Sequence, residues 1–136
     1  MYTQPMEMAR HSAPAPRTSV RTEAPPVDMA RFLTMVDDDP KILREMATMY
    51  LVESTELMNG LHAALETGDI PEAERLAHKL GGSSATCGML GIVTPLRELE
   101  LSGKARNSQE NEKLLKEADR QHERICAYLV DNVLSH

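Results

Sequence analysis

Large aromatic side chains are scarce in this 136-residue chain, which has no tryptophan, one phenylalanine and three tyrosines. Hydrophobic residues nevertheless make up 41% of the sequence, so the interior must be built from Leu, Met, Ile, Val and Ala. These side chains suit helices packed on helices better than a β-sandwich. The length fits one small domain. The composition therefore favours a single all-α domain.

Basic residues are also fewer than acidic residues in this chain. The chain has 15 Lys and Arg against 21 Asp and Glu, a net charge of −6, whereas nucleic-acid-binding surfaces are basic. Its two cysteines, Cys87 and Cys126, are too few for a disulfide framework and indicate reduced thiols. No apolar run approaches the roughly 20 residues that span a bilayer, and the N-terminus lacks the apolar region of a secretory signal. We therefore expect a cytoplasmic protein that binds neither nucleic acid nor membrane.

The first 26 residues differ in composition from the rest of the chain. They hold five of the eight prolines and contain no leucine or isoleucine. Such a segment buries too little apolar surface to offset the entropy lost on ordering its chain. We predict a disordered, proline-rich N-terminal segment over residues 1–26 and a helical domain over residues 27–136.

From residue 27 onward, apolar residues recur at helical spacing, and no alternating pattern indicates a strand. The pattern predicts a short lead-in helix over 28–36 and longer helices over about 40–68, 70–88, 89–101 and 109–134. Acidic residues followed by proline, as in Asp39-Pro40 and Asp69-Ile70-Pro71, are typical of helix starts. Short turns between the long helices predict an antiparallel up-down four-helix bundle.

Two details of this prediction depend on single helices. Pro95 lies inside the fourth long helix, so that helix either starts late, with Thr94 as its N-cap, or kinks at the proline. The second helix should bury one apolar face, which the spacing assigns to Ile42, Met46, Met49, Tyr50, Leu57, Leu61 and Leu65.

The third long helix carries the most informative run, Leu76-Ala77-His78-Lys79-Leu80-Gly81-Gly82-Ser83-Ser84. Two adjacent glycines destabilise a helix by roughly 1 kcal/mol each relative to alanine, so their presence indicates a need for open space. Alternatively, the glycines end the helix at Leu80, but small residues continue in phase to Cys87 and favour a continuous helix. On a helical wheel, the residues of this helix fall into two groups. We predict a buried stripe of Ala73, Leu76, Leu80, Ser83 and Cys87, and an outer face of Glu74, His78, Gly81, Gly82 and Ala85.

The stretch Ala77-His78-Lys79-Leu80-Gly81-Gly82-Ser83-Ser84, followed by Gly88 and by Leu99-Glu100, resembles the histidine-containing phosphotransfer (HPt) domain of two-component phosphorelays. The resemblance covers about residues 28–134. It implies that His78 accepts a phosphoryl group from a receiver-domain phosphoaspartate and passes it to another receiver aspartate. It also implies a phosphocarrier without its own nucleotide site, whose partners are response-regulator receiver domains and a (hybrid) sensor histidine kinase. Mg²⁺ is expected on the receiver, and no cofactor or metal on this chain.

The resemblance also implies supporting roles for residues near His78. Glu100 stands near the position where the family places an acceptor for the second imidazole nitrogen. Lys79 and Arg75 offer positive charge for phosphoryl oxygens, Gly82 lets the receiver approach, and Ser83 belongs to the same motif. The family commonly has Lys or Arg where this chain has Gly81. That departure keeps open an alternative, a non-catalytic helical docking module for receiver or kinase domains.

The sequence also gives expectations for two further residues, for metal binding and for the oligomeric state. His122 falls in phase with apolar residues of the last helix and is expected to pack in the core. Met89 is a candidate for an apolar docking rim near His78. A metal or cofactor carrier is disfavoured, because His78 and Cys87 lie on opposite helix faces. One bundle can bury its own apolar faces, so we expect a monomer, with a dimer through exposed methionines as the alternative.

Overall fold

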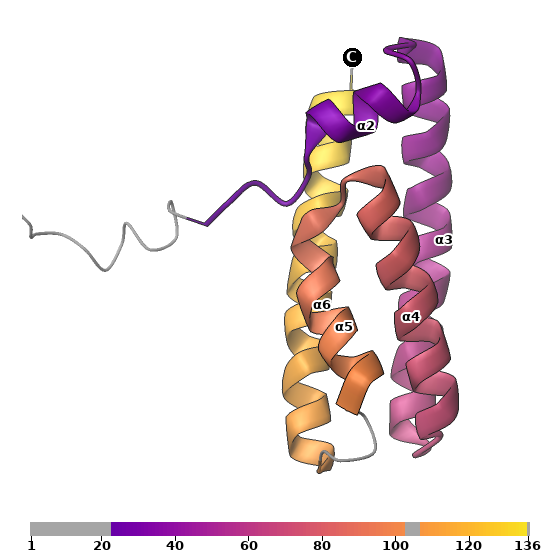
Figure 1. Ribbon diagram of the computed structural model, residues 1–136, viewed down its shortest axis with the longest axis vertical. Helices are drawn as coiled ribbons and strands as arrows, with labels where there is room; N and C mark the ends of the chain where they lie inside the picture. The colour runs from indigo at the N-terminus through magenta and orange to yellow at the C-terminus, as the bar shows by residue number, and fades with distance from the viewer. Residues whose placement is uncertain (1–22, 103–106, 136) are drawn as a thin grey trace, which may run out of the picture.

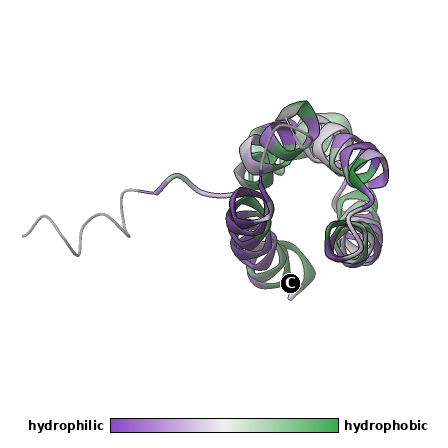
Figure 2. Cartoon of the chain, turned by 90° about the horizontal axis from the view of Figure 1, so that it is seen from below, coloured by the Kyte–Doolittle hydropathy of each residue, from purple (hydrophilic) through white to green (hydrophobic). Residues whose placement is uncertain are grey.

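The computed structural model describes residues 23–102 and 107–135, in which all regular structure is helical (Figure 1). The main helices run up and down beside one another, and the short helix that precedes them, α2 (Met29–Met35), lies across one end, next to the C-terminus (Figure 1). Seen along the long axis, the helices surround a common interior (Figure 2). The elements are α2 (Met29–Met35), α3 (Pro40–Glu66), α4 (Ile70–Cys87), the 3-10 turn η2 (Leu90–Ile92), α5 (Val93–Ser102), α6 (Ser108–Leu129) and the π-helical turn η4 (Val130–Leu134). The predicted helical bundle with a lead-in helix is confirmed.

Four helices begin at a capping side chain, which explains why their starts were predictable. At α3, Oδ1 of Asp39 accepts hydrogen bonds from the backbone N–H groups of Lys41 and Ile42, at 2.9 and 3.2 Å. Such a cap satisfies backbone donors that have no partner within the helix. The other capping residues are Asp28 for α2, Asp69 for α4 and Asn107 for α6.

Pro95 is accommodated by a late helix start. The chain forms the 3-10 turn η2 after Met89, and α5 begins only at Val93. Pro95 is therefore the third residue of α5, where its missing N–H would have no helical partner. Thr94 lies inside the helix, so its predicted role as N-cap is wrong.

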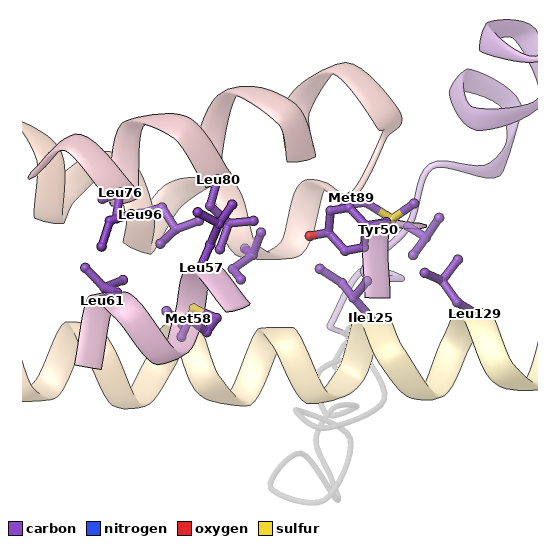
Figure 3. Packing of buried hydrophobic residues seen from close by; sticks show 14 of the residues in the cluster. Tyr50, Leu57, Met58, Leu61, Leu76, Leu80, Met89, Leu96, Ile125 and Leu129 are labelled. Carbon is purple, nitrogen blue, oxygen red and sulfur yellow. The ribbon is translucent and has the colours of Figure 1, made fainter. Parts of the chain in front are cut away.

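The core lies between α3, α4, α5 and α6, whose leucines and other aliphatic side chains meet in the interior (Figure 3). On α3, the predicted buried face is partly wrong, because Ile42 and Met49 are 42% and 63% exposed. Ala47 and Ser54 are buried instead. Small and polar residues complete this face, and a pattern that counts only large apolar residues misplaces its centre.

Two polar contacts, one buried and one half-buried, tie α3 to its neighbours. The hydroxyls of Tyr50 on α3 and Ser84 on α4 lie 2.8 Å apart in a hydrogen bond. Burial raises the pKa of the Tyr50 hydroxyl. Oγ of Ser54 lies 2.8 Å from Nε2 of His122 on α6, which is half-buried as expected for a packing histidine. These contacts satisfy polar groups that would be unfavourable if buried alone.

The chain before α3 packs against α4 and α6. The backbone N–H of Asp28 donates to the carbonyl of Gly88, at 2.7 Å, where α4 ends. Earlier in the chain, the carboxylate of Glu23 accepts hydrogen bonds from Arg120 and Gln121 of α6. The predicted N-terminal segment, 1–26, lies mostly outside the described residues, but its residues 23–26 are described and contact the bundle.

We predict that Gly88→Ala destabilises the fold, whereas Gly82→Ala does not. Gly88 has a φ of 84°, and a Cβ there would lie 2.7 Å from the carbonyl oxygen of Asp28. The free energy of unfolding should fall by about 1–3 kcal/mol. Gly82 is helical with open space around it, so alanine should raise that free energy by about 0.5–1 kcal/mol. Urea denaturation followed by circular dichroism measures both, and equal stabilities would contradict the prediction.

We also predict that His122 makes stability depend on pH. Burial lowers the pKa of His122 below its ordinary value of 6.5, and this effect outweighs the opposing influence of Asp119 and Glu123. The unfolded chain therefore takes up a proton that the folded protein does not, so stability falls as the pH drops through this range. Between about pH 7.5 and 5.5, wild type should lose more unfolding free energy than His122→Gln. Parallel losses in the two proteins would contradict this assignment.

Candidate functional site

His78 stands on the surface of the bundle, at the edge where α4 meets α5. Its side chain is 74% exposed, and Nδ1 lies 2.6 Å from Oε2 of Glu100 on α5. The Glu100 side chain is 29% exposed, so it is more shielded from solvent than the His78 ring. No described residue forms a hydrogen bond with the other ring nitrogen, Nε2. The pairing of His78 and Glu100 that the family resemblance implies is therefore present as a direct contact.

The two glycines after His78 have different surroundings. Helix α4 continues through both, as the sequence predicted. Gly81 is buried, and a Cβ there would lie 3.6 Å from Cβ of Leu96 on α5. Gly82 is exposed, and a Cβ there would meet nothing within 4 Å. The prediction that both glycines lie on the outer face is therefore wrong for Gly81, which packs against α5, and right for Gly82.

This difference arises because α4 has two neighbours. It packs against α3 on one side and α5 on the other, so its buried arc is wider than a single stripe. Ala77, Gly81 and Ser84 are buried within this arc, while Ser83 and Cys87, which the wheel placed at its centre, are only half-buried. His78 lies at the α5 edge of the arc rather than opposite its centre.

The other predicted supporting residues do not converge on the imidazole. Arg75 is held by Glu72 through two hydrogen bonds of 2.7 and 2.8 Å, which also lower the pKa of the Glu72 carboxyl. Lys79 is exposed and forms no ion pair with a described residue. Adjacent residues diverge by about 100° around a helix, so Lys79 points away from the ring. The Ser83 hydroxyl donates to the Leu80 carbonyl, at 3.3 Å, within α4.

One residue with a predicted role is misplaced, and one residue without a predicted role lies close to Glu100 along α5. Met89 is fully buried, so its predicted place on a docking rim is wrong. Arg97, for which no role was predicted, is exposed on α5 one helical turn before Glu100. The spacing of Arg97 from Glu100 can be counted in the sequence, but the sequence does not show that α5 packs beside α4.

Within residues 23–102 and 107–135, no group of three or more His, Cys, Asp or Glu side chains is arranged to hold a metal ion. In the same ranges, every helix is too short or too polar to cross a bilayer.

Comparisons with known proteins agree with this arrangement. The chain matches the family model of the Hpt domain over residues 45–130, which include both His78 and Glu100. Its fold resembles the crystal structure of histidine-containing phosphotransfer protein B (HptB) from Pseudomonas aeruginosa PAO1, with a TM-score of 0.75 and 21% sequence identity. That likeness covers 84% of this chain and 99% of the HptB chain. No sequence among curated proteins is significantly similar. On the family match, this chain belongs to the Hpt domain family, whose members transfer phosphoryl groups through a histidine in phosphorelays.

Proposed function

We propose that His78 is the phosphoryl carrier of this domain, taking the group from a receiver-domain phosphoaspartate and passing it to another receiver aspartate. The observation that carries this proposal is the hydrogen bond between Nδ1 of His78 and Glu100, on a ring that is 74% exposed. A histidine with only a packing role would bury its ring. Here Nδ1 is hydrogen-bonded, and no described residue forms a hydrogen bond with Nε2.

The contact with Glu100 selects the reactive nitrogen. A carboxylate accepts a hydrogen bond, so Nδ1 carries the proton and the lone pair of the neutral ring lies on Nε2. In the transfer, Nε2 attacks phosphorus, an N–P bond forms, and the P–O bond to the receiver aspartate breaks. The aspartate leaves as a carboxylate. The proton stays on Nδ1, where the negative charge of Glu100 stabilises the positive charge that develops on the ring.

The partner supplies what this chain does not. Stabilisation in phosphoryl transfer comes mainly from positioning and charge neutralisation, and we place Mg²⁺ and the acidic pocket on the receiver. Open backbone at Gly82 gives a receiver loop room to approach His78. We assign this chain no nucleotide site and no kinase activity. It acts as a cytoplasmic monomer between a hybrid sensor histidine kinase and a response regulator.

The alternative is a docking module that binds receiver or kinase domains without carrying a phosphoryl group. The observation in its favour is Gly81, which stands where the family commonly has a basic residue. Both functions would use the same binding surface, but only the phosphocarrier would be phosphorylated on His78.

We predict that Glu100 fixes the tautomer of His78. In wild type, the neutral ring should carry its proton on Nδ1, because the Glu100 carboxylate accepts it at 2.6 Å. Glu100→Ala should shift the population toward the Nε2–H form, whereas Glu100→Gln keeps an acceptor oxygen and should change it less. Nitrogen chemical shifts of the His78 ring report the tautomer. A wild-type ring protonated mainly on Nε2 would contradict the proposed nucleophile.

We predict that His78→Gln abolishes phosphorylation and leaves receiver binding unchanged. Label should pass from a phosphorylated receiver to wild type as an acid-labile, base-stable phosphohistidine. His62→Gln is the matched control, because His62 is also exposed and its Nε2 lies 2.9 Å from the carboxylate of Asp119. This control should accept label like wild type.

Two outcomes would refute the proposal. Label that persists on His78→Gln would place the phosphoryl group elsewhere. A wild-type protein that binds receivers but takes up no label from any of them would establish the docking module instead.

A further inference from the structure

We infer that Arg97 of α5 supplies the positive charge that neutralises the phosphoryl group at His78, in place of a basic residue on α4 itself. This inference rests on the proposed function. It assigns a role to a residue that neither the sequence pattern nor the family match singles out. Three observations carry it: the register of α5 against α4, the state of the cations on α4, and the open surroundings of Gly82.

The register of the two helices places Arg97 beside the site. Leu96 lies next to Gly81, and Glu100 bonds to His78, so α5 runs antiparallel along α4 between these two contacts. Arg97 follows Leu96 directly and precedes Glu100 by three residues. Side chains at that spacing share one helix face, with Cβ atoms about 5–6 Å apart.

Burial on α5 shows which side Arg97 occupies. Pro95, Leu96 and Leu99 face the core, and Glu100 lies at the edge of that buried surface. On a helical wheel, Arg97 lies just beyond Glu100, further toward solvent, and on the same side as His78. Arg97 is exposed, as this position requires.

The charge of Arg97 is available, whereas the two cations on α4 are either paired or directed away from the ring. Arg75 is engaged by Glu72 through two hydrogen bonds. Lys79 is unpaired among the described residues, but it diverges from the ring around α4. Arg97 forms no ion pair with a described residue, even with Glu100 one turn away. Its guanidinium can therefore turn toward a newly arrived anion.

Helix α4 carries no side chain at the two positions that follow Leu80. Gly81 and Gly82 contribute no Cβ, and the surroundings of Gly82 are open. A phosphoryl group on Nε2 brings two negative charges close to the Glu100 carboxylate, so a nearby cation should stabilise it. Guanidinium suits this task, because its planar donors pair with two phosphoryl oxygens at once.

The test uses phosphoramidate, a small donor that has no docking surface. Its phosphoryl group moves to His78 as the P–N bond to ammonia breaks, so the rate reports chemistry at the site alone. Phosphorus NMR follows the formation of phosphohistidine. Arg97→Gln should lower the rate constant about tenfold, as expected for the loss of a charge-assisted contact. Arg97→Lys should retain an intermediate rate, because lysine keeps the positive charge but lacks the planar guanidinium that donates two hydrogen bonds at once.

Lys116→Gln is the matched control, since it removes an exposed cation on α6 outside the site. An unchanged rate in Arg97→Gln, or an equal fall in Lys116→Gln, would overturn the inference. With a phosphorylated receiver as donor, Arg97→Gln should lower the maximal rate and leave the half-saturating receiver concentration unchanged. A change in half-saturation alone would make Arg97 a docking contact and overturn the inference. If wild type accepts no phosphoryl group from either donor, the proposed function itself fails.

Discussion

The contact between α4 and α5 at Gly81 determines the geometry of the site. A Cβ at Gly81 would lie 3.6 Å from Cβ of Leu96, an ordinary van der Waals distance, so the two helices pack closely at this point. Leu96 lies beside Gly81, and one turn further along α5 the Glu100 carboxylate meets the imidazole of His78. A glycine inside a helix costs about 1 kcal/mol relative to alanine. Here that local cost accompanies an interhelical contact on which the orientation of the ring depends.

The rest of the bundle holds α4 in place while leaving its reactive side chain outside. The Tyr50–Ser84 hydrogen bond fixes α4 against α3, and the contact between Gly88 and Asp28 fixes its C-terminal end against the chain entering α2. Functional side chains work best when the elements that carry them are rigid. His78 satisfies this condition, since its helix is held on several sides and its ring remains accessible to a protein partner.

Local signals made much of the fold predictable, whereas contacts between helices did not follow from them. Asp39 and Asp69 cap the helices that they were expected to start, because capping depends on residues a few positions apart. Glu100 was reached only through the family resemblance, since spacing within one helix cannot identify a partner on another. The same limit explains the error at Gly81, because a wheel for α4 alone does not show that two helices share its buried arc.

The arrangement divides the chemistry between two helices. Helix α4 carries the nucleophile and the open backbone that admits a partner. Helix α5 carries the carboxylate that orients the ring and, in our proposal, the guanidinium that neutralises the phosphoryl group. Both α5 groups lie within one turn of the same helix, so they move together relative to His78. Any change in the packing of Leu96 against Gly81 therefore alters ring orientation and local charge at once. Position 81 carries no basic side chain, and in our proposal the positive charge comes instead from the helix that packs beside this glycine.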